Sequence, residues 1–141
     1  MSVAKAFLDT NILLYLLSAD TAKADRAEVV MAAGGIISVQ VMNEFASVAT
    51  RKLGMSVTEV RDVLTPIRVL CTVEPLTTAT HDEALNLMEH HSFSLHDALI
   101  VAAATLAGCD RLYSEDMHHG QTINGRLTIQ NPFADDFPLP A

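Results

Sequence analysis

The sequence predicts a single-domain α/β protein, a three-layer sandwich whose mostly parallel central sheet of about five strands carries helices on both faces. Two observations lead to this prediction. Short apolar runs alternate with longer segments of helical composition, which is the pattern of βαβ units on a parallel sheet. The chain has 141 residues, of which 50% are hydrophobic, and a chain of this size buries roughly 68–70% of the surface that it exposes when unfolded. One core can therefore form without disulfides.

We expect each strand and helix where the composition of the sequence indicates it most clearly. The strands are short apolar runs, at 6–8, 36–37, 69–71, 111–113 and 127–129. The helices lie around and between them, at 10–18, 22–33, 39–53, 56–68, 77–91 and 95–107. Gly34, Gly54 and Gly108 each follow a predicted helix, where a left-handed C-cap favours glycine. Ser56–Glu59 and Ser94–Asp97 have the spacing of a capping box. Helix 95–107 is apolar nearly all round, which indicates burial.

The domain is expected to cover residues 1–133, followed by a short proline-rich tail at 134–141. The two cysteines, Cys71 and Cys109, lie in apolar stretches and are expected to be buried thiols rather than a disulfide framework. No segment has the pattern of a signal peptide or the length of a membrane span. These features predict a cytoplasmic protein with no membrane association.

The charge balance restricts how the protein can meet nucleic acid. The chain has 17 Asp and Glu against 9 Lys and Arg, a formal net charge of −8. A general basic coat for phosphate binding is excluded, because counterion release needs clustered Lys and Arg. Nucleic acid reached through metal ions is still compatible with this composition.

Four acids stand out by their positions relative to the predicted strands. Asp9 directly follows the first strand, and Asp116 follows the strand at 111–113. Glu44 lies in the early turns of helix 39–53, and Asp97 lies in the first turn of helix 95–107. Ligands of open parallel sheets bind outside the carboxyl ends of the strands. The four carboxylates are therefore expected at one ligand-binding rim.

Four neighbouring carboxylates cannot all stay ionised without a cation or a bound proton. Hard divalent ions, Mg²⁺ or Mn²⁺, suit such an oxygen-rich set. The histidine pairs 90–91 and 118–119 are adjacent residues that point different ways, so no zinc spacing is present. The predicted site suits metal-assisted hydrolysis of phosphodiesters, in which one divalent ion activates a water and a second stabilises the leaving oxygen.

At these residues the sequence resembles the PIN domain family. The resemblance covers about residues 5–133 and rests on five segments, Phe7-Leu8-Asp9-Thr10-Asn11, Asn43-Glu44-Phe45, the helix from Asp97 to Ala104, Ser114-Glu115-Asp116 and Asn131-Pro132-Phe133. Stand-alone domains of this length resemble VapC-type toxins. The resemblance implies a Mg²⁺- or Mn²⁺-dependent endoribonuclease that acts on RNA, is held inactive by a cognate antitoxin and forms a homodimer.

The resemblance also implies roles for individual residues. The family's acidic quartet, catalytic and metal-binding, falls on Asp9, Glu44, Asp97 and Asp116. Polar positions beside these acids, implied to contact substrate, fall on Thr10, Asn11 and Ser114. Asn11 is expected to steady Asp9 through hydrogen bonds. His96 departs from the family, which often has an aromatic residue beside the third acid.

Plainer interpretations remain open for several of these residues. Asp9 is also a suitable helix N-cap, Asp97 a capping-box acid, and Glu44 an ordinary solvated helix residue. Glu115 could take the role of Asp116. His118 and His119 are expected to be exposed loop residues.

Two alternatives concern surfaces rather than single acids. The basic residues Arg51, Lys52, Arg61 and Arg68 form either a solvated helix face or an RNA-facing rim. The alternative function is a non-catalytic PIN-like interaction module whose acidic cleft binds a basic partner.

Overall fold

The computed structural model describes residues 6–137, and these contain a six-stranded sheet with the strand order β3-β2-β1-β4-β6-β5. The strands are β1 (Ala6–Leu8), β2 (Gly35–Ser38), β3 (Cys71–Glu74), β4 (Arg111–Tyr113), β5 (Thr122–Ile123) and β6 (Leu127–Gln130). Every neighbouring pair is parallel except β5 and β6, which are antiparallel. The predicted mostly parallel sheet is confirmed, with one more strand than expected.

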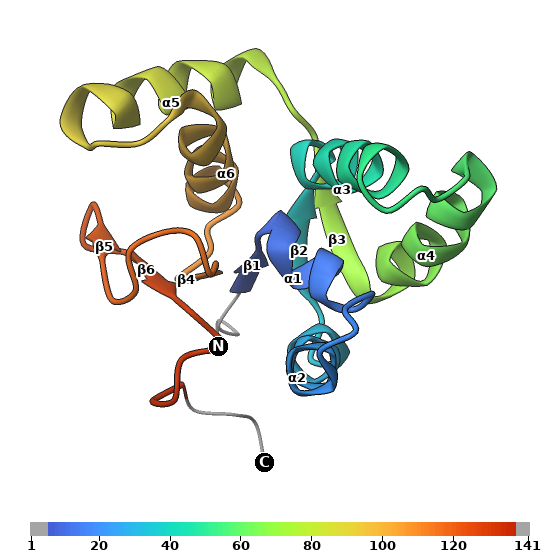
Figure 1. The fold of residues 1–141 in the computed structure, drawn as a ribbon. Coiled ribbons are helices and arrows are strands. Elements are labelled where there is room, and N and C mark those ends of the chain that lie inside the picture. The colour runs from blue at the N-terminus through green and yellow to red at the C-terminus, as the bar shows by residue number, and fades with distance from the viewer. Residues whose placement is uncertain (1–5, 138–141) are drawn as a thin grey trace.

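Helices flank the sheet on both faces, as predicted. They are α1 (Thr10–Tyr15), α2 (Thr21–Ala32), α3 (Val39–Arg51), α4 (Val57–Leu70), α5 (Thr78–His90) and α6 (Leu95–Leu106). In Figure 1, α5 and α6 lie above the sheet and α2 lies below it. Helix α6 packs on β2 and β4 as well as on α3 and α5, whereas α2 packs on α1 and α4.

Among residues 6–137, no helix is both long and apolar enough to cross a bilayer.

The core lies between the central strands and the helices that cover them. Phe7 on β1, Phe45 on α3 and Leu112 on β4 have no exposed surface. Helix α6 is buried on most of its circumference, from Ala98 and Ile100 through Ala104, which confirms the prediction from its apolar composition. Cys71 and Cys109 are both buried.

Two predicted boundaries were wrong. The strand expected at 69–71 is Cys71–Glu74, because Val69 and Leu70 form the last turn of α4, where their side chains are 82% and 50% exposed. A three-residue apolar run does not distinguish the end of a helix from a strand. The first helix, expected at 10–18, is regular only over Thr10–Tyr15.

The strand that the sequence analysis missed, β5, has only two residues. It pairs with β6 across the turn Asn124-Gly125, in which both residues have positive φ, 53° and 67°. Consecutive positive φ angles favour Asn-Gly and define the tight hairpin turn that matches the twist of paired strands. The Asn-Gly dipeptide was therefore an available signal for this hairpin.

The predicted tail is described only in part. Phe137 is buried and packs edge to face on Tyr113, with ring centroids 5.2 Å apart. Residues 138–141, together with residues 1–5 of the predicted domain, lie outside the described residues.

Helix starts on the carboxyl side of the sheet set the positions of the predicted acids. Asp9 caps α1 directly after β1, and Ser38 at the end of β2 caps α3, which carries Glu44. Ser94 caps α6 and places Asp97 in its first turn. Asp116 follows β4, which pairs with β1 in register Leu8 to Tyr113. Because the strands are parallel, these segments lie at the same edge of the sheet.

Candidate active site

Four acidic side chains from four separate segments line one cleft with a volume of about 300 Å³. They are Asp9 after β1, Glu44 on α3, Asp97 on α6 and Asp116 after β4. The other residues that line the cleft are Thr10, Asn11, Leu14, Ser47, Val48, Arg51 and His96. The structure thus brings together the four acids that the sequence analysis selected.

Asp9 is the most buried of the four, with 5% of its surface exposed. Its Oδ1 accepts a hydrogen bond from the Thr10 backbone N–H, and its Oδ2 accepts one from the Ser114 hydroxyl, both at 2.7 Å. Burial raises the pKa of Asp9 from 3.8 to about 6; these two hydrogen bonds oppose the rise, and the charges of Glu44 and Asp116 add to it. The side chain is both the cap of α1 and a wall of the cleft.

This shifted pKa predicts a pH-dependent stability in buffer without divalent ions. The folded-state pKa of about 6 lies above the ordinary value of 3.8. At a pH between these two values, the protein therefore takes up a proton when it folds. The free energy of unfolding therefore falls as the pH rises through this window, by about 3 kcal/mol for a shift of this size. We expect Asp9→Asn to lack this loss and to gain about that much stability over wild type between about pH 4 and about pH 7.

Urea unfolding of both proteins in EDTA measures the difference. The difference between the two proteins at each pH reports the removal of the Asp9 charge, including its coupling to Glu44 and Asp116. A difference that stays constant across this pH range contradicts the assignment.

Glu44 does not behave as a solvated helix residue, since its carboxylate has two side-chain neighbours. The Thr10 hydroxyl donates to its Oε2 at 2.6 Å, and the His96 imidazole Nε2 contacts its Oε1. The other ring nitrogen of His96 lies 3.1 Å from the Gln40 side-chain nitrogen. The residue that departs from the family pattern therefore lies inside the cleft, against one of its acids.

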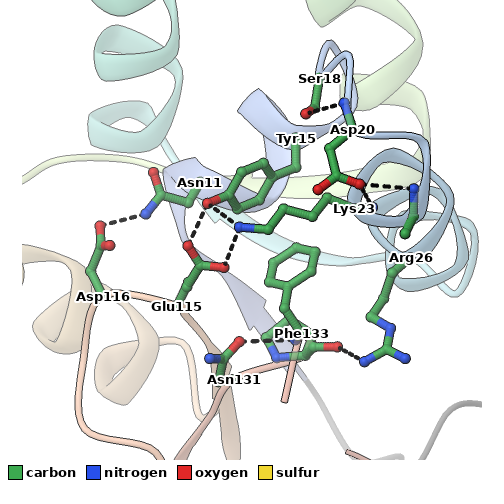
Figure 2. A network of polar contacts seen from close by, with 12 residues as sticks. Asn11, Tyr15, Ser18, Asp20, Lys23, Arg26, Glu115, Asp116, Asn131 and Phe133 are labelled. Atoms are coloured by element: carbon green, nitrogen blue, oxygen red, sulfur yellow. Dashed lines mark hydrogen bonds and ion pairs between the residues drawn. The ribbon is translucent and has the colours of Figure 1, made fainter. Parts of the chain in front are cut away.

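Asp116 is held by Asn11, which corrects the sequence-based expectation. The Asn11 amide donates to Asp116 Oδ2 rather than to Asp9 (Figure 2). Asp9 is held instead by the Thr10 backbone and the Ser114 hydroxyl, one on each oxygen. Glu115, considered as a substitute for Asp116, is not part of the cleft lining; its carboxylate contacts Tyr15 and Lys23 instead.

At Asp97 only one of the two hydrogen bonds of the expected capping box is present. Its backbone N–H donates to the Ser94 hydroxyl at 3.1 Å. At Ser56 the reciprocal bond from the backbone to the Glu59 carboxylate is present, at 2.9 Å, but in the described residues 6–137 no such bond ties Asp97 back to Ser94. The Asp97 carboxylate is consequently available to the cleft.

The three polar residues expected to contact substrate have carboxylate partners in the protein. Thr10 donates to Glu44, Asn11 to Asp116 and Ser114 to Asp9. Ser114 has no exposed surface, so its hydroxyl acts on Asp9. Contact of this set with substrate stays a prediction.

Helical spacing could have identified further lining residues. Ser47 and Arg51 follow Glu44 by three and seven positions, which places all three on one face of α3. His118 and His119 are exposed, as expected; they are not among the residues that line the cleft, and His119 contacts Asp136.

Comparisons with known proteins agree with the fold and with the family that the sequence resembles. The family model described as PIN domain matches residues 6–122. No curated protein matches the chain. A toxin–antitoxin complex from Klebsiella pneumoniae is similar with a TM-score of 0.68 and 20% identity, over 92% of this chain and 98% of that chain.

Two further solved structures are similar. VapC20 of Mycobacterium tuberculosis, described as a toxin that cleaves the sarcin–ricin loop, has a TM-score of 0.64 and 22% identity, over 79% of this chain and 90% of its own. VapBC2 from Rickettsia felis, solved with a promoter DNA fragment, has a TM-score of 0.65 and 16% identity, over 89% of this chain and 97% of that chain. At these identities the likeness establishes a shared fold.

Proposed function

Since the chain belongs to the PIN domain family, we propose that it is a divalent-metal-dependent endoribonuclease and the toxin of a VapBC-type toxin–antitoxin pair. The observation that carries the proposal is the cleft lined by Asp9, Glu44, Asp97 and Asp116. The structural neighbours support it, because one is described as a toxin that cleaves the sarcin–ricin loop and another as a toxin–antitoxin complex.

The donor chemistry of the cleft fits Mg²⁺ or Mn²⁺, which prefer carboxylate oxygens. The four acids would hold the ion. Among the described residues no three His, Cys, Asp or Glu side chains are arranged to hold an ion as they stand, so the carboxylates have to turn toward it on binding. When bound, such an ion lowers the pKa of water and neutralises phosphate charge.

The raised pKa of Asp9 is an independent reason to expect a cation. Burial and the neighbouring charges of Glu44 and Asp116 penalise the ionised carboxylate. A nearby positive charge favours the ionised form, so a bound cation would offset the cost of ionising this group.

Neutral donors keep the acids in place for this chemistry. Ser114 and the Thr10 backbone fix both oxygens of Asp9. The Thr10 hydroxyl and the Asn11 amide each hold an acid from a different segment, Glu44 and Asp116. Partners of this kind orient the groups that bind a metal and are typically worth 10–100-fold in affinity or activity. The short segment Asp9–Asn11 is therefore the organising centre of the proposed site.

The direct test is cleavage of RNA by the purified protein. We expect a mixed pool of structured RNAs to be cut in Mg²⁺ or Mn²⁺, cutting to stop in excess EDTA, and activity to return when the ion is restored. The activity should follow the protein through its last purification column. Cleavage that persists in EDTA, or no cleavage of any RNA in either metal, contradicts the proposal.

Arg51 is the proposed contact for a substrate phosphate. Of the described residues that line the cleft, it is the one Lys or Arg. Its Nε donates to the Ser47 carbonyl at 3.4 Å, and within residues 6–137 its guanidinium forms no ion pair. An arginine with free donors at an acidic cleft is suited to bind the phosphate that has to approach the carboxylates.

We expect Arg51→Gln to raise KM for RNA several-fold with a smaller change in kcat. A lost phosphate contact also reduces the slope of log affinity against log salt by roughly 0.7 for a single strand. Cleavage measured at several salt concentrations gives both quantities. Arg126→Gln, at an exposed position in the turn between β5 and β6, is the matched control and should retain the wild-type slope. Equal slopes for Arg51→Gln and wild type argue against the contact.

The remaining parts of the proposal follow the family. We propose a cytoplasmic homodimer that is inhibited by a cognate antitoxin. Basic side chains of such a partner would be attracted to the acid-lined cleft. The similar structure from Klebsiella pneumoniae is described as a toxin–antitoxin complex, and the one from Rickettsia felis as VapBC2 bound to a promoter DNA fragment.

A second candidate function is a non-catalytic module whose acidic cleft binds a basic partner. The observation that favours it is the lack, in the described part of the chain, of a group of three side chains already arranged for an ion. Partner binding is expected under both proposals, so it does not separate them. Metal dependence does, because only the nuclease requires the ion.

A further inference from the structure

A second polar network lies directly behind the cleft and is not used by the proposed chemistry. Its centre is Glu115, the residue next to Asp116. Figure 2 shows the Glu115 carboxylate between the Tyr15 hydroxyl and the Lys23 amine. The Lys23 Nζ lies 3.3 Å from Glu115 Oε2 and 3.2 Å from the Tyr15 hydroxyl oxygen. Three side chains from α1, α2 and the loop after β4 therefore meet in one closed set of contacts.

The network attaches the loop after β4 to α1 at two adjacent residues. Asp116 accepts from Asn11, and Glu115 accepts from Tyr15. Asn11 and Tyr15 are four positions apart on α1, so they lie on the same helical face. Two consecutive loop residues are thus fastened to neighbouring positions of one helix, one inside the cleft and one outside it.

The outer attachment is itself braced. Lys23 lies 4.5 Å from the centroid of the Tyr15 ring and 5.9 Å from that of Phe133. The Tyr15 and Phe133 rings pack edge to face with centroids 4.7 Å apart. Arg26 donates to the carbonyls of Pro132 and Ala134, at 3.1 and 3.2 Å. The segment after β6 therefore helps to hold Tyr15 and Lys23 where they meet Glu115.

Asp116 needs such support more than the other acids do. It is exposed, and its described hydrogen bond comes from Asn11. Asp9 is fixed by burial and two bonds, and Glu44 and Asp97 stand on helices. An exposed loop carboxylate that is not restrained loses conformational entropy when it takes part in a site.

We propose that Glu115 is a positioning residue, which holds Asp116 at the cleft through its contacts with Tyr15 and Lys23. The inference rests on the proposed function, in which Asp116 helps to hold the divalent ion. It makes the α1–α2 pair and the segment after β6 determinants of how tightly the site binds metal. Glu115 itself does not face the cleft and takes no direct part in the chemistry.

The test uses two variants that separate positioning from simple electrostatics. Lys23→Met removes a positive charge near the site but keeps the apolar stem, and Tyr15→Phe removes only the hydroxyl. If Lys23 and Tyr15 acted only through their charges, Lys23→Met would bind a cation more tightly than wild type, and Tyr15→Phe would bind it with the wild-type affinity. Positioning predicts that both bind Mn²⁺ roughly tenfold more weakly, the usual scale for groups that orient metal-binding side chains.

Mn²⁺ affinity is measured by calorimetric titration of the full chain. Arg68→Met, at an exposed position in the last turn of α4, is the charge-matched control and should bind like wild type. Mn²⁺ binding by Lys23→Met and Tyr15→Phe that equals or exceeds the wild-type affinity overturns the proposal.

Amide hydrogen exchange without metal gives a second readout that does not depend on the proposed function. Positioning predicts exchange faster by about tenfold in both variants at Ser114 and Gly120, the amides on either side of the loop, which donate to the Gln130 and Ile129 carbonyls, since each variant loses a hydrogen bond that involves a charged group. Exchange in α5 should not change. If wild type binds no Mn²⁺, the proposed function fails, yet exchange still decides the positioning role. Unchanged exchange at Ser114 and Gly120 overturns it.

Discussion

Asp9→Asn and Asp97→Asn are each expected to lower kcat for RNA cleavage by at least about 10³-fold while the protein stays folded. Each substitution removes one negative charge from the proposed metal site without changing the size of the side chain. Metal ions are worth several kcal/mol of transition-state stabilisation in such hydrolysis, and each 1.36 kcal/mol is a factor of ten in rate. Cleavage of one defined RNA under single-turnover conditions measures the effect.

The two substitutions differ in what else they disturb, which makes the pair informative. Asp9 caps α1 and accepts from Ser114, so Asp9→Asn changes a hydrogen-bonded group in the interior. Asp97 is half-buried, and within residues 6–137 its carboxylate has no hydrogen bond to the Ser94 backbone. A loss of activity shared by both variants therefore cannot come from a damaged helix cap.

Asp82→Asn is the matched control, since Asp82 is an exposed acid on α5 and should retain wild-type cleavage. Each variant is also checked for a cooperative thermal transition. Activity of Asp97→Asn within tenfold of wild type would show that this acid has no part in catalysis and would favour the non-catalytic interaction module.

Much of this site could be predicted because its acids are tied to helix starts and strand ends. Asp9 directly follows a buried three-residue strand, and Asp97 lies three residues after the cap Ser94, so local sequence determines where each points. Parallel strands then bring their carboxyl ends to one rim. The convergence of the four acids was thus accessible without any tertiary contact being known.

The hydrogen-bond partners of these acids could not be predicted from the local sequence in the same way. Whether Asn11 donates to Asp9 or to Asp116 depends on how the loop after β4 lies against α1, and Asp116 is 105 positions from Asn11 in the sequence, as Ser114 is from Asp9. The His96–Glu44 contact and the network around Glu115 likewise join distant segments. Such contacts depend on tertiary packing, which periodicity and capping patterns do not encode.

The boundaries that were misplaced have a related cause. Val69 and Leu70 are apolar and precede a strand, yet their side chains are largely exposed at the end of α4. Apolar character alone does not predict burial, because single exposed apolar residues are common on protein surfaces.

The second large expected effect is stabilisation of the protein by metal, which needs no knowledge of the substrate. A ligand that binds only the folded state adds about 2.7 kcal/mol at one hundred times its dissociation constant. For a domain of this size that corresponds to a rise in Tm of roughly 10 °C. We expect Mn²⁺ and Mg²⁺ to produce such a rise in the wild-type protein free of any antitoxin, and EDTA to reverse it.

The variants turn this measurement into a test of the carboxylate cluster. Without metal, Asp9→Asn should melt above wild type at neutral pH, because it lacks the carboxylate whose burial raises its pKa to about 6 and makes its ionisation costly. At about one thousand times the dissociation constant, where binding adds about 4.1 kcal/mol, the order should reverse, because this gain exceeds the roughly 3 kcal/mol advantage of Asp9→Asn and neither variant shares it. This reversal in the order of the Tm values follows only if the charges that destabilise the metal-free protein are the ones that hold the ion. If metal leaves every Tm unchanged and both variants remain more stable than wild type, the acids are a repulsive cluster without an ion, and a basic protein partner becomes the preferred occupant of the cleft.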